Sequence, residues 1–177
     1  MSLKLLLSLL LYLICTASLT AAVYQEPETF LSEVFAGDVP DPNIIWLTGE
    51  RKKVSSEILG HRYSSLRIRY WQRDNRTTWI LEEVGKDLPI TVGFVIEDGN
   101  INQTRVLIFR ESRGWEIRHP FFTDQFVQAR LDEQQQLDRT IDGISGATLS
   151  VRAMKKLARL SLYLDQQARL QDVAPTP

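Results

Sequence analysis

Cysteine, histidine and surplus positive charge are all scarce in this sequence. Its 177 residues include one cysteine, Cys15, and two histidines, His61 and His119, which are far apart in the chain. The chain after Cys15 therefore cannot form a disulfide, and a transition-metal site made of thiolates and imidazoles is not expected. The 21 Lys and Arg residues face 22 Asp and Glu residues, so no basic surplus indicates nucleic acid as a partner.

A hydrophobic run long enough to span a membrane is also missing. The apolar stretch Leu5–Ile14 is shorter than the roughly 20 residues that cross a bilayer. It follows the cation Lys4 and precedes small residues that end at Ala22. This layout predicts a signal peptide over residues 1–22 with cleavage after Ala22, and hence an exported, periplasmic protein. The alternative is an uncleaved N-terminal segment that holds the protein at the membrane.

Residues 23–89 are expected to form the N-terminal part of the mature domain. Apolar residues at helical spacing predict a short helix over 27–35, and the apolar run at 44–47 indicates a short strand. A second helix is expected from the N-cap Thr48 through Leu59, with a glycine immediately after it as its stop.

The middle of the chain alternates apolar and polar residues with a period of two. This pattern predicts an antiparallel meander of about four strands, and the Asp98–Asn100 turn marks one of its hairpins. Helices outside a continuous meander indicate one α+β domain. The four strands are expected over 66–71, 77–84, 90–97 and 105–109.

The remainder of the chain is expected to be mainly helical. One helix is predicted from about Thr123 to Asp132, and a long amphipathic helix from near Gly146 to about Leu170, before a loose tail over 171–177. The apolar stripe of the long helix comprises Ala153, Met154, Leu157, Leu160, Ser161 and Leu164.

The long helix begins at the stretch DGISGAT, residues 142–148, which has unusually little bulk. Ser145 is the expected N-cap, so that Gly146, Ala147 and Thr148 would present unpaired N–H groups at the positive end of the helix dipole. Such a helix start suits an anion such as phosphate. The residues alone leave open an ordinary capped helix start or a non-covalent phosphate site.

The same stretch resembles the flavinylation motif of the FMN-binding domain family. That family includes the covalent-FMN subunits of the sodium-pumping NADH:quinone reductase and of the Rnf complex, and small exported bacterial flavoproteins. The match covers Asp142, Ser145, Gly146, Ala147 and Thr148. The resemblance implies an FMN-binding region over about 90–170 and FMN joined through its phosphate to the Thr148 hydroxyl by a dedicated flavin transferase. It also implies that Asp142 assists this transfer.

Several other residues are candidates for contact with the isoalloxazine ring. Trp115, His119 and Phe121 offer flat or apolar surfaces, and Gly93 inside a strand would allow close approach of a ligand. The alternative for the aromatic residues is ordinary packing in the core or a loop.

These observations lead to a functional hypothesis. We expect an exported electron-transfer flavoprotein that exchanges electrons with a redox partner, itself membrane-bound, and not a complete enzyme. No Ser-His-Asp order, paired catalytic carboxylates or dinucleotide fingerprint is present. The alternatives are a sensory or interaction module that binds flavin or another phosphate ligand without redox turnover, and an interaction domain with no ligand.

Overall fold

Alternating apolar and polar residues build an antiparallel sheet of six strands. The computed structural model describes residues 21–173. The strands lie in the order β1-β6-β5-β4-β3-β2, and every neighbouring pair is antiparallel. The predicted four-stranded meander and the short strand near 44–47 are confirmed, and a sixth strand is added at one edge. The strands are β1 (Ala22–Val23), β2 (Asn43–Trp46), β3 (Arg67–Arg73), β4 (Arg76–Val84), β5 (Pro89–Glu97) and β6 (Asn100–Phe109).

The first of these strands bears on the predicted N-terminal processing. The expected cleavage point after Ala22 falls inside β1, where Ala22 and Val23 pair with Phe109 and Ile108 of β6. The apolar run Leu5–Ile14 lies outside the described residues.

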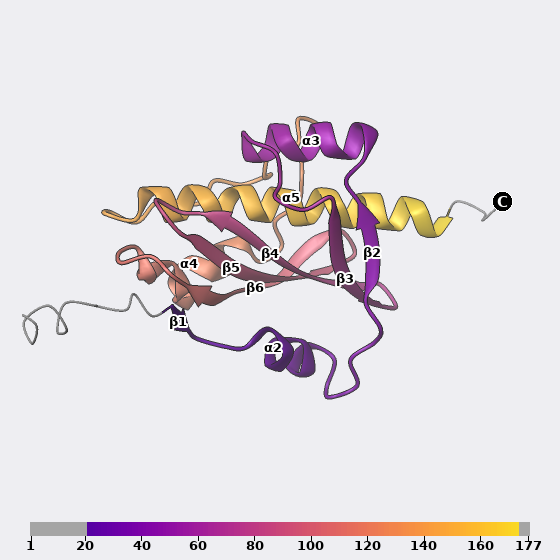
Figure 1. Ribbon diagram of the computed structural model, residues 1–177, viewed down its shortest axis with the longest axis horizontal. Coiled ribbons are helices and arrows are strands. Elements are labelled where there is room, and N and C mark those ends of the chain that lie inside the picture. Colours follow the sequence, from indigo (N-terminus) through magenta and orange to yellow (C-terminus); the bar gives the residue numbers. More distant parts are fainter. Residues whose placement is uncertain (1–20, 174–177) are drawn as a thin grey trace, which may run out of the picture.

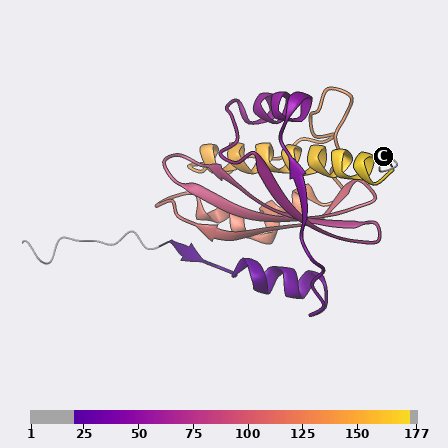
Figure 2. The same ribbon diagram turned by 45° about the vertical axis from the view of Figure 1, so that its right-hand side comes forward.

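Helices cover both faces of the sheet. Figure 1 and Figure 2 show α5 across one face with α3 outside it, whereas the short α2 lies on the opposite face. This arrangement confirms the α+β class. No helix within residues 21–173 is long and apolar enough to cross a membrane. The helices are α2 (Pro27–Val34), α3 (Gly49–Leu59), η1 (Trp115–Arg118), α4 (Pro120–Thr123), η2 (Asp124–Phe126) and α5 (Thr148–Val173).

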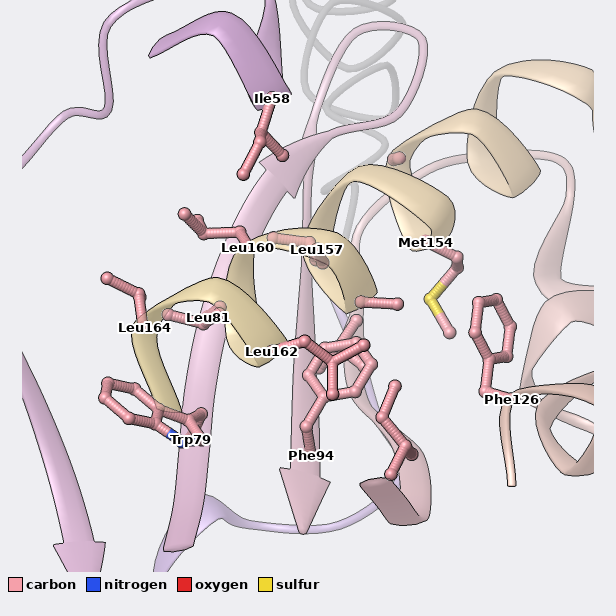
Figure 3. Packing of buried hydrophobic residues seen from close by; sticks show 14 of the residues in the cluster. Ile58, Trp79, Leu81, Phe94, Phe126, Met154, Leu157, Leu160, Leu162 and Leu164 are labelled. Carbon is pink, nitrogen blue, oxygen red and sulfur yellow. The ribbon is translucent and has the colours of Figure 1, made fainter. Parts of the chain in front are cut away.

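The main hydrophobic core lies between α5 and the sheet. The predicted apolar stripe of α5 is buried, and its leucines meet Trp79 and Leu81 of β4 and Phe94 of β5 (Figure 3). On the outer side of α5, Ile58 of α3 completes the packing. Each fully buried large apolar side chain contributes about 1.5–3 kcal/mol. This burial holds α5 firmly along the sheet, and with it the position of its first turn.

A buried polar network fixes α5 along the direction of β4. Asp165 is fully buried and accepts a hydrogen bond from Thr77 Oγ1 at 2.6 Å and another from Arg169 Nε at 2.8 Å. Trp79 Nε1 donates to Thr77 Oγ1 at 2.9 Å. A one-residue slip of the helix would leave this carboxylate buried without its partners, which is costly.

The helix predicted from Thr123 to Asp132 is wrong. Helical structure ends with η2 at Phe126, and Gln128 adopts a left-handed φ of 64°. The main chain turns out of the helix because it hydrogen-bonds to β6: Gln128 N–H donates to the carbonyl of Ile101, and Ile101 N–H donates to the carbonyl of Ala129. Pairing with a neighbouring strand thus overrides a weak helical pattern.

Candidate functional site

The SGAT stretch forms a tight turn and then the first residue of α5. Ala147 N–H donates to the carbonyl of Ile144 at 3.0 Å, and Gly146 has a φ of 83°. A positive φ at the third position is the requirement of a type II turn, and glycine meets it without strain. The first helical hydrogen bond then runs from Val151 N–H to the carbonyl of Ala147 at 2.9 Å. Thr148 is therefore the first helical residue.

This geometry corrects the predicted helix cap. Ser145 is exposed in the turn and makes no capping hydrogen bond, so the prediction that Ser145 caps α5 is wrong. The left-handed Gly146 separates Ser145 from the helix, and Ala147 takes the cap position instead. The N–H groups of Thr148, Leu149 and Ser150 are the ones that lack an acceptor within the helix.

A cavity of about 540 Å³ opens beside this first turn. Thr148 is exposed toward it, whereas Ala147 and Ser150 are buried on the helix side. The other wall comes from the turn between β4 and β5 and from the segment after β6. The cavity is lined by Lys86, Glu111, Ser112, Arg113, Gly146, Ala147, Thr148, Leu149 and Ser150.

Sequence reasoning missed the four residues from these two other segments. A signal for them was nevertheless present in the predicted meander. In three consecutive antiparallel strands, the turn that joins the first strand to the second lies at the same end of the sheet as the last residues of the third strand. Lys86 and the 111–113 segment meet there, beside the start of α5.

Glu111 holds the turn between β4 and β5 in place. Its Oε1 accepts hydrogen bonds from the N–H groups of Lys86, Asp87 and Leu88 at 2.5, 2.6 and 2.8 Å. Three consecutive backbone donors form a concave anion-binding arrangement, which the Glu111 carboxylate fills from within the protein. These three hydrogen bonds stabilise the negative charge of Glu111, which itself lines the cavity.

The cavity also carries positive charge. Lys86 Nζ lies 3.2 Å from Asp87, and Arg113 makes no ion pair or hydrogen bond with the residues that the structure describes. Together with the free N–H groups of the first helical turn, these cations form a donor set suited to a phosphate group.

Close packing holds the 112–115 turn against α5. Gly114 is buried with a φ of 87°, and a Cβ built there would lie only 2.5 Å from Ser150 Oγ and 3.4 Å from Ala147 Cβ. A larger residue at position 114 would push this turn, which carries Arg113, away from Thr148.

The predicted ring contacts separate into two groups. Trp115, His119 and Phe121 form one aromatic series: the Trp115 and His119 rings are 5.5 Å apart edge to face, and the His119 and Phe121 rings are stacked 6.1 Å apart. Trp115 is 43% exposed and Phe121 64% exposed. Trp115 follows Gly114 directly, so the series begins next to the cavity.

Gly93 does not belong with this aromatic series. A Cβ on Gly93 would lie 2.4 Å from a ring carbon of Phe30 in α2, which occupies the face of the sheet opposite α5. The glycine in this strand thus accommodates an internal aromatic ring, and a flavin beside Thr148 would not reach it.

Asp142 and Ser145 are also outside the cavity lining. The N–H of Asp142 donates to Gln125 Oε1 at 2.7 Å, and its carboxylate is exposed. The described residues include no group of three or more His, Cys, Asp or Glu side chains arranged to hold a metal ion.

The comparisons with known proteins agree with the chemistry of this cavity. Residues 85–162 match the model of the FMN-binding domain family, a segment that includes both walls of the cavity and the first half of α5. The protein is therefore a flavin-binding protein. More specifically, the match supports an FMN-binding domain over this part of the chain, with FMN as its cofactor. No curated protein is similar enough to the chain to count as a match.

Proposed function

We propose that the protein carries FMN covalently as a phosphoester on Thr148. The observation that carries this proposal is the exposed Thr148 at the start of a 26-residue helix, beside a cavity with two cations, in a segment that matches FMN-binding domains. Thr148 is the exposed hydroxyl of the first turn, because Ser150 is buried and Ser145 is outside the cavity lining.

The donors around Thr148 have complementary roles in this proposal. The N–H groups of Leu149 and Ser150 would bind phosphate oxygens, and Arg113 and Lys86 would balance the remaining negative charge. Gly146 and Ala147 leave the approach to the backbone free of bulk.

Formation of the ester needs an activated donor. The Thr148 hydroxyl oxygen would attack the flavin-side phosphorus of a flavin dinucleotide, and the anhydride bond to AMP would break. AMP leaves as the dianion, and the threonine proton passes to a base of the flavin transferase. The exposed Asp142 would assist the transferase in this step. No external oxidant is required.

The exposed aromatic surface beside the cavity would hold the isoalloxazine ring. Trp115 and Leu149, which is 40% exposed, are the chain neighbours of Gly114 and Ser150, which lie close together, and the rings of His119 and Phe121 continue the aromatic series from Trp115. Flat apolar surfaces suit the ring. We include these residues in the proposed binding surface and leave out Gly93.

We further propose that the protein is an exported electron carrier. The cofactor when bound supplies redox chemistry, and the protein supplies its tether and its orientation. A covalent tether makes flavin occupancy independent of concentration, whereas a non-covalent site with a dissociation constant of ~1 μM would empty on dilution outside the cytoplasm. Its partners would be the transferase and a membrane-bound redox protein.

Intact mass of protein produced in a host with the transferase tests both parts. We expect a chain that begins at Val23 and is heavier by one FMN less one water. Thr148→Val keeps the size and branching of the side chain but removes its oxygen, so it should fold with a stability loss of about 1 kcal/mol or less and carry no flavin in denaturing gels. The matched variant Ser150→Ala should retain covalent flavin.

Two results would contradict these expectations separately. Covalent flavin on Thr148→Val, with the modified peptide carrying Ser145 or Ser150, would place the ester on another residue. A chain that retains Met1 would refute cleavage of the signal peptide but leave the flavin site intact. Reduction of the loaded protein by a membrane fraction distinguishes a carrier from a sensory module, which would not exchange electrons at a useful rate.

A further inference from the structure

The face of the sheet opposite α5 has a cavity of its own. In Figure 1 α2 lies on this face, and its Phe30 packs with Val95 and Leu107 of β5 and β6. The cavity, of about 660 Å³, lies next to α2, over β3 and β4. This volume is within the range of about 300–1,000 Å³ that small-molecule sites occupy.

The floor and sides of this cavity are apolar and aromatic. Leu31 of α2 is buried, and Ile80 and Ile108 of the sheet are half-buried. Tyr63 and Trp71 supply aromatic rings along the side formed by β3 and the loop before it. An apolar molecule the size of a fused aromatic ring would remove this surface from water.

Two arginines at one side of the cavity have no anionic partner among the described residues. Arg67 and Arg69 are exposed and line the cavity from the same face of β3, two residues apart. Neither guanidinium makes an ion pair or hydrogen bond with residues 21–173, and the contact of Arg69 is with the Trp71 ring, 6.0 Å from its centre. Spaced about 7 Å apart, as i and i+2 in a strand are, two guanidinium groups can both reach one carboxylate.

The acidic residues of the lining do not cancel this charge. Glu82 Oε1 accepts a hydrogen bond from Thr91 Oγ1 at 2.6 Å and pairs with Arg110 at 3.4 Å, so its charge is already balanced. Glu28 is exposed on α2. The lining holds two arginines and two glutamates, but Arg110 from outside the lining neutralises Glu82, which leaves an excess of one positive charge.

We propose that this cavity is a second ligand site, which takes a monomeric organic anion with an aromatic body and a single carboxylate. The body rests on Ile80, Ile108 and Leu31, and the carboxylate bridges Arg67 and Arg69. The site is on the opposite face from Thr148 and does not depend on the flavin proposal.

Calorimetry with two matched probes tests this proposal on the full purified protein. We use 1-naphthoate and 1-naphthalenemethanol, which share the ring system and differ in the negative charge. The wild type should bind 1-naphthoate saturably with one site per chain, and about tenfold more tightly than the alcohol. The double variant Arg67→Gln/Arg69→Gln should lose this difference and bind both probes equally.

Two controls locate the effect. Arg152→Gln/Lys155→Gln removes two cations from α5 and should leave the affinity for 1-naphthoate unchanged. In the wild type, amide NMR shifts on titration should concentrate in β3 and β4, a readout that needs no variant. The proposal is overturned by non-saturable binding, by equal wild-type affinity for the two probes, by an equal loss in the α5 variant, or by shifts centred on residues 146–150.

Discussion

Gly114→Ala tests whether close packing at the start of α5 shapes the Thr148 cavity. The substitution has two costs. Alanine at a φ of 87° pays a left-handed penalty of about 1–2 kcal/mol. Its Cβ would also lie 2.5 Å from Ser150 Oγ and 3.3 Å from Ser150 Cβ, and overpacking of this kind costs about 1–3 kcal/mol. We therefore expect a loss of about 2–5 kcal/mol in the free energy of unfolding.

A matched glycine separates the two costs. Gly37 has a φ of 85°, and a Cβ there would meet nothing within 4 Å, so Gly37→Ala carries the conformational cost alone. Urea unfolding of flavin-free protein should thus show a larger loss for Gly114→Ala than for Gly37→Ala, by the overpacking cost. Ser150→Ala removes the nearest atom and should relieve part of the Gly114→Ala loss, with a coupling of about 0.5–2 kcal/mol.

The same variant has a functional readout. Displacement of the 112–115 turn moves Arg113 away from Thr148, so Gly114→Ala should carry less covalent flavin than Gly37→Ala under equal expression. Equal stability losses at the two glycines, together with strictly additive effects of Gly114→Ala and Ser150→Ala, would refute the packing argument.

Three further predictions concern other parts of the molecule. Ser145→Ala should change the unfolding free energy by less than about 0.5 kcal/mol, because Ser145 does not cap α5. A loss near 1 kcal/mol in urea unfolding would show instead that Ser145 does cap the helix. The pKa of His61 is raised by its hydrogen bond to the Arg62 carbonyl and then by that to Glu83. Its stabilising contribution should be complete below about pH 6.5 and disappear as the pH rises through the raised pKa, so His61→Gln should destabilise the protein at pH 6 more than at pH 9. Equal losses at both pH values would show that the imidazolium has no such role. Gly93→Ala should cost about 1–3 kcal/mol in thermal or urea unfolding, because its Cβ would lie 2.4 Å from a ring carbon of Phe30 in α2. An unchanged stability would mean that α2 can shift away from the sheet without cost.

Local patterns determined most of the elements. The alternation of apolar and polar residues over the middle of the chain was enough to predict the meander, because one face of each strand must be buried whereas the other need not be. The helix α5 could be predicted in the same way, because it buries one side and its apolar residues therefore recur at the spacing of a helix. These patterns are strong wherever a long element buries one whole side, as the stripe from Ala153 to Leu164 does.

The sequence also indicated the class of ligand, and the tertiary structure decided the shape of the cavity. The residues from Asp142 to Thr148 by themselves suited only an anion at a helix start, and flavin was implied by their resemblance to the flavinylation motif of the FMN-binding domain family. The cavity walls could not be read in this way, because Arg113 and Lys86 come to line the same cavity as Thr148 only when three strands and a helix are assembled. For the same reason, the left-handed Gly146 moved the helix start to Thr148, and pairing with β6 ended the helix expected after Thr123. Main-chain conformation at such junctions follows from hydrogen-bond partners that are distant in sequence, and only the folded chain supplies them.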